Sequence, residues 1–462
     1  MEKLKKFIGD KRFYMMVLGV AMPIMIQNGI TNFVSLLDNI MVGQIGTEQM
    51  SGVAIVNQLL FIYNLCIFGG VSGAGIFTAQ YFGQGNHEGI RNTFRFKFWI
   101  AAVLTVIAVV LLGTAHEPLI RLYLTGEEGS QDMSLALRYG TQYMKLMLLG
   151  LPPFMFVQIY AGTLRETGET VTPMKAGIAA VLINLVLNYI LIYGKLGAPR
   201  LGVAGAAIAT VISRYVEAAI VIFWTHMHKQ ENPFADGLYR TMKVPVALAK
   251  QIIVKGTPLM LNETLWAAGM AVLMQCYSVR GLNVVAGMNI SNTIGNLFNV
   301  AFIALGDSVA IIVGQLLGAG KMKQARETDT KLIAFSVALC VVIGAAMALI
   351  SPLFPKLYNT TDDVRHMATI FIAEAACFMP VNAFLHAAYF TLRSGGKTII
   401  TFLFDSVFIW VVSVPFAYVL SRFTGLSIYA IYLAVMSADL IKCVVGFVLV
   451  KKGVWIHNIV VE

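Results

Sequence analysis

Two stretches of this chain, 235 residues apart, decide how the rest of it is organised. Residues 80–93 read "QYFGQGNHEGIRNT" and residues 315–328 read "QLLGAGKMKQARET", and the two align without a gap. The pairs that match at this single offset include Gln80 with Gln315, Gly83 with Gly318, and Arg91 with Arg326. Chance does not hold one offset over a long stretch, so the pattern indicates an internal duplication.

The duplication extends to both sides of these stretches. Pro23 matches Pro258 at the same offset, and "TLRETGET" (163–170) matches "TLRSGGKT" (391–398) at an offset of 228. The smaller offset indicates that a loop of the second half has lost residues. We therefore predict an N-terminal lobe, an inter-lobe linker and a C-terminal lobe, formed by residues 1–228, 229–247 and 248–462.

The composition is that of a membrane protein. Of the 462 residues, 58% are hydrophobic and only 13% are charged, and the mean hydropathy is +0.74. A soluble domain carries about 25% charged residues. Long apolar runs recur along the chain. Each can cross the roughly 30 Å hydrocarbon core as a helix, because lipid offers the backbone no hydrogen-bond partner. We predict twelve spans, at residues 14–42, 50–78, 92–114, 136–160, 168–193, 200–225, 248–278, 284–314, 330–351, 364–390, 398–421 and 427–450.

The number of spans predicts the symmetry of the fold. Because each half has an even number of spans, both halves enter the membrane from the same side. The predicted fold is an all-α integral membrane protein, with twelve transmembrane helices in two homologous six-helix bundles related by a pseudo-twofold axis along the membrane normal. This parallel-repeat plan is typical of transporters. Lys and Arg are concentrated in the loops on the N-terminal side, which predicts cytoplasmic termini in a multi-pass plasma-membrane protein.

Two other classes of protein are disfavoured. The formal net charge of +10 is spread over short loops rather than gathered in one patch, so we predict no nucleic-acid binding. The chain contains no HExxH, GxSxG or P-loop motif, so we predict that it is not an enzyme and needs no cofactor.

One carboxylate lies inside the first apolar span. Asp38 is the only charged residue of "FVSLLDNIMVG" (33–43), and a carboxylate near the centre of a membrane helix costs about 2.5–3.5 kcal/mol. Two interpretations stay open. Asp38 either reaches interfacial water, or it belongs to a coupling site where a bound Na⁺ or proton neutralises it.

Other polar residues within the spans also have two interpretations. Asn184 and Asn188 are four residues apart and share one helix face, where they either hydrogen-bond to another helix or face a cavity. Glu263 is an acid of the seventh span, and its repeat partner is Asn28, so the two halves carry their acids at non-equivalent positions. Pro23 and its repeat partner Pro258 also have two interpretations: each either makes a fixed bend in its helix or marks a point at which the helix flexes.

Several further side chains are predicted to be structural or to line a cavity. Arg214 with Glu217, and Asp439 with Lys442, have the spacing of ion pairs on one helix face. Asp405 has no partner nearby in the sequence. The polar residues that we predict for a substrate cavity are Asn28, Asn262, Asn382 and His386, although a hydrogen bond within the bundle is the alternative for His386.

Taken together, these stretches resemble one family, the multidrug and toxic compound extrusion (MATE) transporters, in the bacterial NorM/DinF-like branch. The resemblance covers about residues 14–450. It rests on the two-lobe plan and on motifs such as "AMPIMIQNGITNFVSLLDNIMVGQIG" (21–46), "AQYFGQGNHEGIR" (79–91) and "GTLRETGETVTPM" (162–174). The resemblance implies export of amphipathic, often cationic organic compounds, driven by an inward gradient of H⁺ or Na⁺.

The resemblance also implies roles for particular residues. The family places an ion-binding Asp at the position of Asp38, surrounded by residues that match Asn184, Asn188 and Thr210. Some relatives have a second Asp in place of Asn188, so either Na⁺ or H⁺ could be the coupling ion here. If the ion is the metal Na⁺, the oxygen atoms of Asp38 and Asn184 would be among its ligands.

The second lobe departs from the family pattern in one place. A functional Glu of the family matches Glu263, but an Asp of the tenth span is replaced here, where the nearest match is Asn382. In the family, the first-span proline, Pro23 here, is associated with bending of its helix.

The function that we predict is a cation-coupled antiporter, driven by Na⁺ or H⁺, that exports amphipathic, mostly cationic organic compounds by alternating access and works as a monomer in membrane lipid. The alternatives are a flippase for lipid-linked precursors from the same superfamily, and a channel. A channel would not need acids placed asymmetrically in its two halves.

Overall fold

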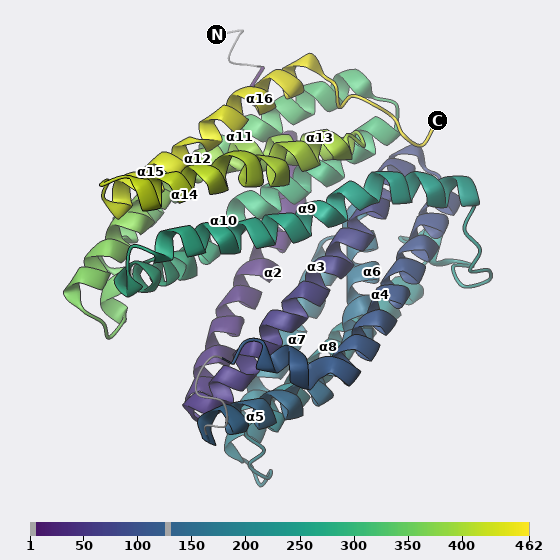
Figure 1. Ribbon diagram of the computed structural model, residues 1–462. Coiled ribbons are helices and arrows are strands. Elements are labelled where there is room, and N and C mark those ends of the chain that lie inside the picture. The colour runs from purple at the N-terminus through teal and green to yellow at the C-terminus, as the bar shows by residue number, and fades with distance from the viewer. Residues whose placement is uncertain (1–5, 125–130, 462) are drawn as a thin grey trace. The chain divides into compact units, whose positions relative to one another are not determined.

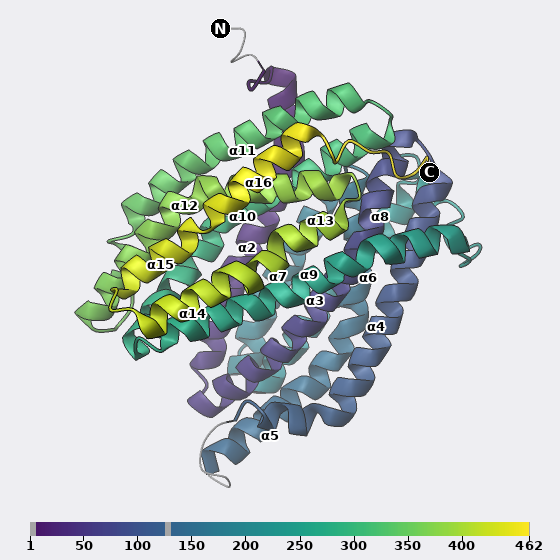
Figure 2. The same cartoon turned by 45° about the horizontal axis from the view of Figure 1, so that its top comes forward.

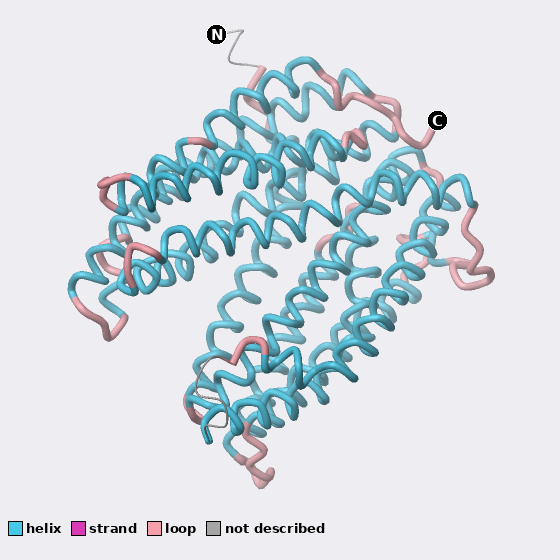
Figure 3. The backbone as a smooth tube through the Cα atoms, viewed as in Figure 1, coloured by secondary structure: helices cyan, strands magenta, loops and turns pink. Residues whose placement is uncertain are grey.

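The computed structural model describes residues 6–124 and 131–461. Within these ranges all regular structure is helical, as Figure 3 shows, which confirms the predicted all-α fold. The long helices are α2 (Lys11–Gly43), α3 (Thr47–Gln84), α4 (His87–Arg121), α5 (Gln131–Met147), α6 (Leu151–Glu166), α7 (Val171–Tyr193), α8 (Val203–Met227), α9 (Val246–Ser278), α10 (Leu282–Gly318), α11 (Met322–Ile350) and α12 (Asp362–Ser394). The chain continues through α13 (Thr398–Phe402), η4 (Leu403–Val407), η5 (Ile409–Ser413), α14 (Val414–Phe423), α15 (Ile428–Ser437) and α16 (Asp439–Lys452).

The predicted spans correspond to these helices. In the described part of the chain, 11 helical segments are long and apolar enough to cross a membrane. The predicted span 248–278 is also one continuous helix, α9, but it is not among them. Lys250, Lys255 and Glu263 within α9 lower its hydropathy, and Glu263 is one of the predicted functional residues.

Three spans are built from shorter pieces. The fourth passes through a 3-10 turn (Leu148–Gly150) between α5 and α6, and the last changes from α15 to α16 at Ala438. The eleventh contains two consecutive π-helical turns, η4 and η5. Such turns widen a helix locally and occur often at functional sites, because they change the direction in which side chains point.

The contacts divide the chain into two compact units. Unit 1 contains the residues up to Met25, Ala79–Asn86 and the chain from Ile253 onward, and unit 2 contains Ile26–Thr78 and His87–Ile252. The start of α2 and the end of α3 therefore pack with the second half of the sequence, although they lie in the first.

Unit 1 is organised around α12. Helices α10, α11 and α16 pack against it, as Figure 2 shows for the green and yellow segments. One apolar core of this unit combines α10, α11 and α12 with the start of α2, through residues such as Leu305, Leu332, Leu392, Phe13 and Val17. Close side-chain packing holds these helices together, because lipid is as apolar as they are.

The duplicated stretches meet inside unit 1. A Cβ atom added to Gly83 would collide with the backbone carbonyl oxygen of Gln315, and one added to Gly318 would collide with that of Gln80. Because Gln80 matches Gln315 and Gly83 matches Gly318 at the offset of 235, the two contacts are repeat copies of each other. The repeat in the sequence is thus a symmetric crossing of the ends of α3 and α10, where glycine lets the two backbones touch.

Unit 2 is a bundle in which α8 packs against α5, α6 and α7, and α4 against α5 and α6 (Figure 1). The predicted linker 229–247 is folded onto this unit rather than loose. Phe234 and Leu238 of the linker are almost completely buried. The Tyr239 hydroxyl hydrogen-bonds to that of Tyr160, and burial raises the pKa of Tyr239 above its ordinary value, so it stays protonated at neutral pH.

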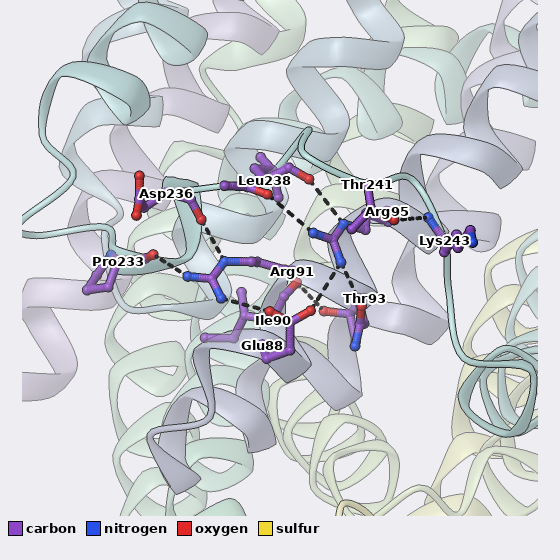
Figure 4. A network of polar contacts seen from close by, with 12 residues as sticks. Glu88, Ile90, Arg91, Thr93, Arg95, Pro233, Asp236, Leu238, Thr241 and Lys243 are labelled. Carbon is purple, nitrogen blue, oxygen red and sulfur yellow. Dashed lines mark hydrogen bonds and ion pairs between the residues drawn. The ribbon is translucent and has the colours of Figure 1, made fainter.

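Two arginines of α4 hold the linker in place (Figure 4). Arg91 donates to the backbone carbonyl oxygens of Asp236, at 2.8 Å, and Pro233, at 3.2 Å. Arg95 donates to the carbonyl oxygen of Leu238 at 3.0 Å and is itself paired with Glu88. Arg91 is one of the residues of the duplicated stretch, so part of that motif is explained by the docking of the linker.

Candidate functional site

In unit 2, the structure brings together four predicted residues from three helices. Asp38 lies on α2, Asn184 and Asn188 on α7, and Thr210 on α8. The Asn188 side-chain amide donates to Asp38 Oδ1 at 2.8 Å and to Asn184 Oδ1 at 3.1 Å. Asn184 and Thr210 are also joined, at 3.2 Å. The first interpretation of Asp38, as a residue that merely reaches interfacial water, does not account for these contacts.

The helical period places the two asparagines inside the unit. The buried positions of α7 include Ala180, Asn184, Asn188 and Ile192, which follow each other at intervals of four. Asn188 is 2% exposed and Asn184 is 6% exposed. Asn188 Oδ1 is buried and has no hydrogen-bond partner, so an acceptor oxygen remains free beside the carboxylate.

The Asn184 amide fits its surroundings in two orientations. In one, Asn184 Oδ1 accepts from Asn188 and its amide group donates to Thr210 Oγ1. In the other, the amide nitrogen donates to the Asp38 carboxylate oxygens at 3.0 and 3.1 Å, and Oδ1 accepts from Thr210. The first orientation directs an oxygen at a carboxylate, which is favourable only when a cation or proton lies between them.

One neighbour of this cluster was not predicted. Tyr143 of α5 interacts with both Asp38 and Thr210, and its hydroxyl donates to Asn57 at 3.4 Å. A buried tyrosine with polar neighbours gives no periodic signal in a sequence, so nothing there distinguished it from a core aromatic residue.

In unit 1, two of the predicted residues, Asn262 and Glu263, interact with a different carboxylate, Asp405. Asn262 is 2% exposed and donates to Asp405 Oδ2 at 3.1 Å, while its own oxygen accepts from Ser406 Oγ at 2.7 Å. Glu263 interacts with Asp405, Asp307 and Arg393. His386 packs edge-on against Phe302, with a ring-centre distance of 4.6 Å. Asn382, one turn before His386 on α12, is partly buried.

Asn28 is a partly buried residue of α2 and belongs to unit 2. The four residues predicted for a substrate cavity are therefore not gathered in one unit.

The predicted local ion pairs have different outcomes. Asp439 and Lys442 form a pair at 3.9 Å. Arg214 and Glu217 interact electrostatically but form no direct pair; the Arg214 guanidinium donates to the Gly150 carbonyl oxygen at 3.3 Å and lies over the Phe154 ring. That part of the prediction was wrong because buried backbone oxygen and an aromatic face satisfy Arg214. Asp405, which had no partner near in sequence, pairs with Lys442 at 3.4 Å.

The two prolines lie inside continuous helices. Pro23 is within α2 and Pro258 within α9. Both are close to the point at which their helix passes from one compact unit to the other, after Met25 in α2 and after Ile252 in α9.

A membrane bundle built twice, with carboxylates inside it, defines a polytopic transporter rather than a soluble protein. The MatE family model matches residues 23–190 and 258–419, which is well over half of the chain. The chain therefore belongs to the MatE family of multidrug transporters, and the resemblance seen in its sequence is confirmed.

Similar proteins agree over almost the full length. The "Probable multidrug resistance protein NorM" of Thermotoga maritima is 22% identical over 94% of this chain and 92% of its own. The "Probable multidrug resistance protein YoeA" of Bacillus subtilis is 25% identical over 90% and 89%. Among solved structures, an outward-facing multidrug resistance MATE transporter of the MOP superfamily has a TM-score of 0.84 at 20% identity, with 98% of each chain covered. A MOP superfamily transporter from Pyrococcus furiosus has a TM-score of 0.85 at 19% identity, with 98% of each chain covered. These structures confirm the predicted fold.

Proposed function

We propose that this protein is a secondary antiporter that exports amphipathic, mostly cationic organic compounds in exchange for Na⁺ or H⁺. The observation that carries the proposal is the cluster around Asp38, a carboxylate among amides and a hydroxyl, with a free buried acceptor on Asn188. The names of the relatives, which are multidrug resistance proteins, support the class of substrate.

The cluster suggests how an ion would act. Without a cation, the amide groups of Asn184 and Asn188 donate to the Asp38 carboxylate. With Na⁺ bound, oxygens of Asp38, Asn184, Asn188 and Thr210 would turn toward it, and a proton would instead neutralise Asp38 directly. Either ion changes which hydrogen bonds join α2, α7 and α8. A tenfold preference of the ion for one conformation shifts the equilibrium by about 1.4 kcal/mol.

Other residues have supporting roles in this proposal. Glu263 is a second titratable acid, near Arg393 and Asp307. Pro23 and Pro258 would let α2 and α9 bend near the boundaries of the compact units. We propose in addition that the protein works as a monomer in the plasma membrane, with both termini cytoplasmic and without a cofactor.

The first experiment imposes one gradient at a time on inverted membrane vesicles that contain the protein. Uptake of a fluorescent organic cation is measured with a Na⁺ gradient alone and with a pH gradient alone. We expect one of the two to drive uptake, and we expect Asp38→Asn to abolish it while the protein stays folded. Uptake driven by Na⁺ assigns the cluster as a Na⁺ site, and uptake driven by pH assigns Asp38 as a proton carrier.

Undiminished gradient-driven uptake by Asp38→Asn would contradict the coupling role of this residue. If neither gradient moves any organic cation in the wild-type protein, the exporter proposal fails. The flippase for lipid-linked precursors, or a channel, then becomes the better proposal.

A further inference from the structure

In unit 1, the ammonium group of Lys442 lies among groups that recognise cations. It is 3.4 Å from Asp405 Oδ1 and 3.9 Å from Asp439 Oδ1. It also lies over two aromatic rings, at 5.7 Å from the centre of Phe404 and 5.5 Å from that of Phe408. Carboxylates combined with aromatic faces are the usual way in which proteins bind organic ammonium ions.

This ammonium group is held loosely for a buried charge. The Lys442 side chain is 9% exposed, yet neither of its contacts with a carboxylate has the 2.7–2.9 Å length typical of a strong charged hydrogen bond. Lys97 of unit 2 shows the contrast. It is fully buried, donates to Thr163 Oγ1 at 3.1 Å and forms a close ion pair with Glu166. A tight structural pairing is thus available in this protein, and Lys442 does not have one.

The two acids are more accessible than the lysine that they hold. The side chains of Asp405 and Asp439 are 22% and 31% exposed, compared with 9% for Lys442. Asp405 is next to the buried residue Phe404 in η4, and Asp439 is three residues before the buried Lys442 in α16. The carboxylates are therefore more accessible to an incoming cation than Lys442 is.

The duplication shows that the position equivalent to Asp405 in the first half has no carboxylate. At the offset of 228, Asp405 corresponds to Gly177, and at 235, Asn262 corresponds to Gln27. In unit 2 the Gln27 side chain lies directly against Gly177 and accepts a hydrogen bond from Arg165 at 2.6 Å. In unit 1 the same place holds a carboxylate, and the amide of Asn262 donates to it at 3.1 Å. The contact between the two positions is conserved between the units, but the charge is not.

The backbone around Asp405 is also unusual. Asp405 lies in the π-helical turn η4, between Phe404 and Ser406, and the turn η5 follows directly. Ser406 is tied to Asn262, which fixes the orientation of this turn. The wider turn presents Phe404 and Phe408 to the same ammonium group.

We propose that Asp405, Asp439, Phe404 and Phe408 form a binding subsite for organic cations, which the ammonium of Lys442 occupies in the absence of substrate. An incoming ammonium or phosphonium ion displaces Lys442, takes over its carboxylate partners and places its apolar groups against the two rings. The proposal rests on the proposed function for its class of substrate, and it deepens that function by naming where the substrate's charge binds.

The test is equilibrium binding of tetraphenylphosphonium to the purified full-length protein in detergent, without any ion gradient. Lys442→Met removes the internal competitor, so we expect affinity to rise about tenfold or more. Asp405→Asn removes the main carboxylate, so we expect affinity to fall by a similar factor. Lys442→Arg keeps a competing cation and should show no gain.

The double variant Lys442→Met/Asp405→Asn is the matched control for folding, because it removes both members of the closer pair and leaves only Asp439, which is 31% exposed, without its lysine. We expect it to fold and to lose the gain in affinity of Lys442→Met. Unchanged or weaker binding by a folded Lys442→Met protein would overturn the subsite, and so would a gain that persists in the double variant.

Failure of the subsite is distinguishable from failure of the antiporter. If ion gradients drive export but the lysine variant gains no affinity, only the subsite is wrong. If the binding changes appear as expected but no gradient drives export, the subsite stands and the antiporter proposal fails.

Discussion

At the scale of single residues, the two carboxylates at the centres of these clusters are balanced in different ways. Asp38 is surrounded by neutral side chains, the amides of Asn184 and Asn188. Asp405 has one amide partner, Asn262, and one internal cation, Lys442. A carboxylate with neutral neighbours attracts an ion from solution, whereas one with its own lysine already has a counter-charge.

The unfilled acceptor on Asn188 leads to a prediction about Na⁺. If the cluster binds Na⁺, the ion stabilises the folded protein by about 2.7 kcal/mol at a concentration of 100 times its dissociation constant. We expect the midpoint of thermal unfolding in detergent to rise with NaCl relative to KCl at the same concentration. Asn188→Leu should remove this Na⁺ effect, because it removes both a ligand oxygen and the donor to Asp38.

Asp405→Asn is the control for this measurement. It removes a carboxylate that pairs with Lys442 inside unit 1 but leaves the cluster of unit 2 unchanged. It should retain the Na⁺ effect. A Na⁺ effect that survives in Asn188→Leu would show that the ion binds elsewhere.

At the scale of elements, the glycines of the duplicated stretch act as contact points between helices. Gly83 of α3 touches the backbone of α10 at Gln315, and Gly318 of α10 touches that of α3 at Gln80. Both neighbouring atoms are backbone atoms, so they cannot move aside as a side chain would.

We therefore expect Gly83→Ala and Gly318→Ala to destabilise the protein by at least the 1–3 kcal/mol that is roughly typical of overpacking. Gly162→Ala is the control, because Gly162 is also inside a helix but a Cβ there meets nothing within 4 Å. Thermal unfolding of the purified proteins measures the difference. A Gly83→Ala protein as stable as Gly162→Ala would mean that the crossing of α3 and α10 adjusts easily.

The linker is the other element whose contacts predict a measurable effect. Arg95 is 3% exposed and holds the carbonyl oxygen of Leu238, while linker residues such as Arg240 and Lys243 are exposed. We expect Arg95→Met to release the linker and to increase the rate at which trypsin cuts after Arg240 or Lys243. Arg326→Ala is the matched control; Arg326 is the repeat partner of Arg91 and contacts the Lys451 carbonyl oxygen instead. Equal cutting rates in wild type and Arg95→Met would mean that the buried Phe234 and Leu238 suffice to hold the linker.

At the scale of the whole molecule, duplication has preserved the helices but not the chemistry. Each compact unit contains an acid-centred cluster, yet the acids lie on non-equivalent helices, Asp38 on α2 in unit 2 and Asp405 in η4 in unit 1. This arrangement allows one unit to bind the coupling ion and the other to bind the substrate.

If one unit binds the coupling ion and the other binds the substrate, two charge-neutralising substitutions should separate ion coupling from substrate binding. Asp38→Asn should keep its affinity for tetraphenylphosphonium within about threefold of wild type but lose export driven by an ion gradient. Asp405→Asn should lose affinity first, and its remaining export should still depend on the gradient. Binding in detergent and uptake into vesicles, measured on both variants, test this. Equal loss of binding in both variants would mean that the two clusters act as one site.

Much of this molecule follows from its linear sequence. The length of each apolar run determines which segments become helices in lipid, because it is a property of residues near one another in the chain. The duplication is visible because equivalent residues such as Gln80 and Gln315 recur at one fixed spacing. The resemblance to a family also pointed to Asp38, Asn184, Asn188 and Thr210, which the structure places together.

Only the tertiary structure decided which side chains are partners across helices. Asp405 and Lys442 are 37 residues apart, and spacing on one helix suggested only that Lys442 belongs to Asp439. The start of α2 and the end of α3 likewise pack with the second half of the chain. Such contacts depend on how each helix is rotated about its axis and on local changes such as the turn η4, and neither is encoded in hydropathy or in the spacing of residues along one helix.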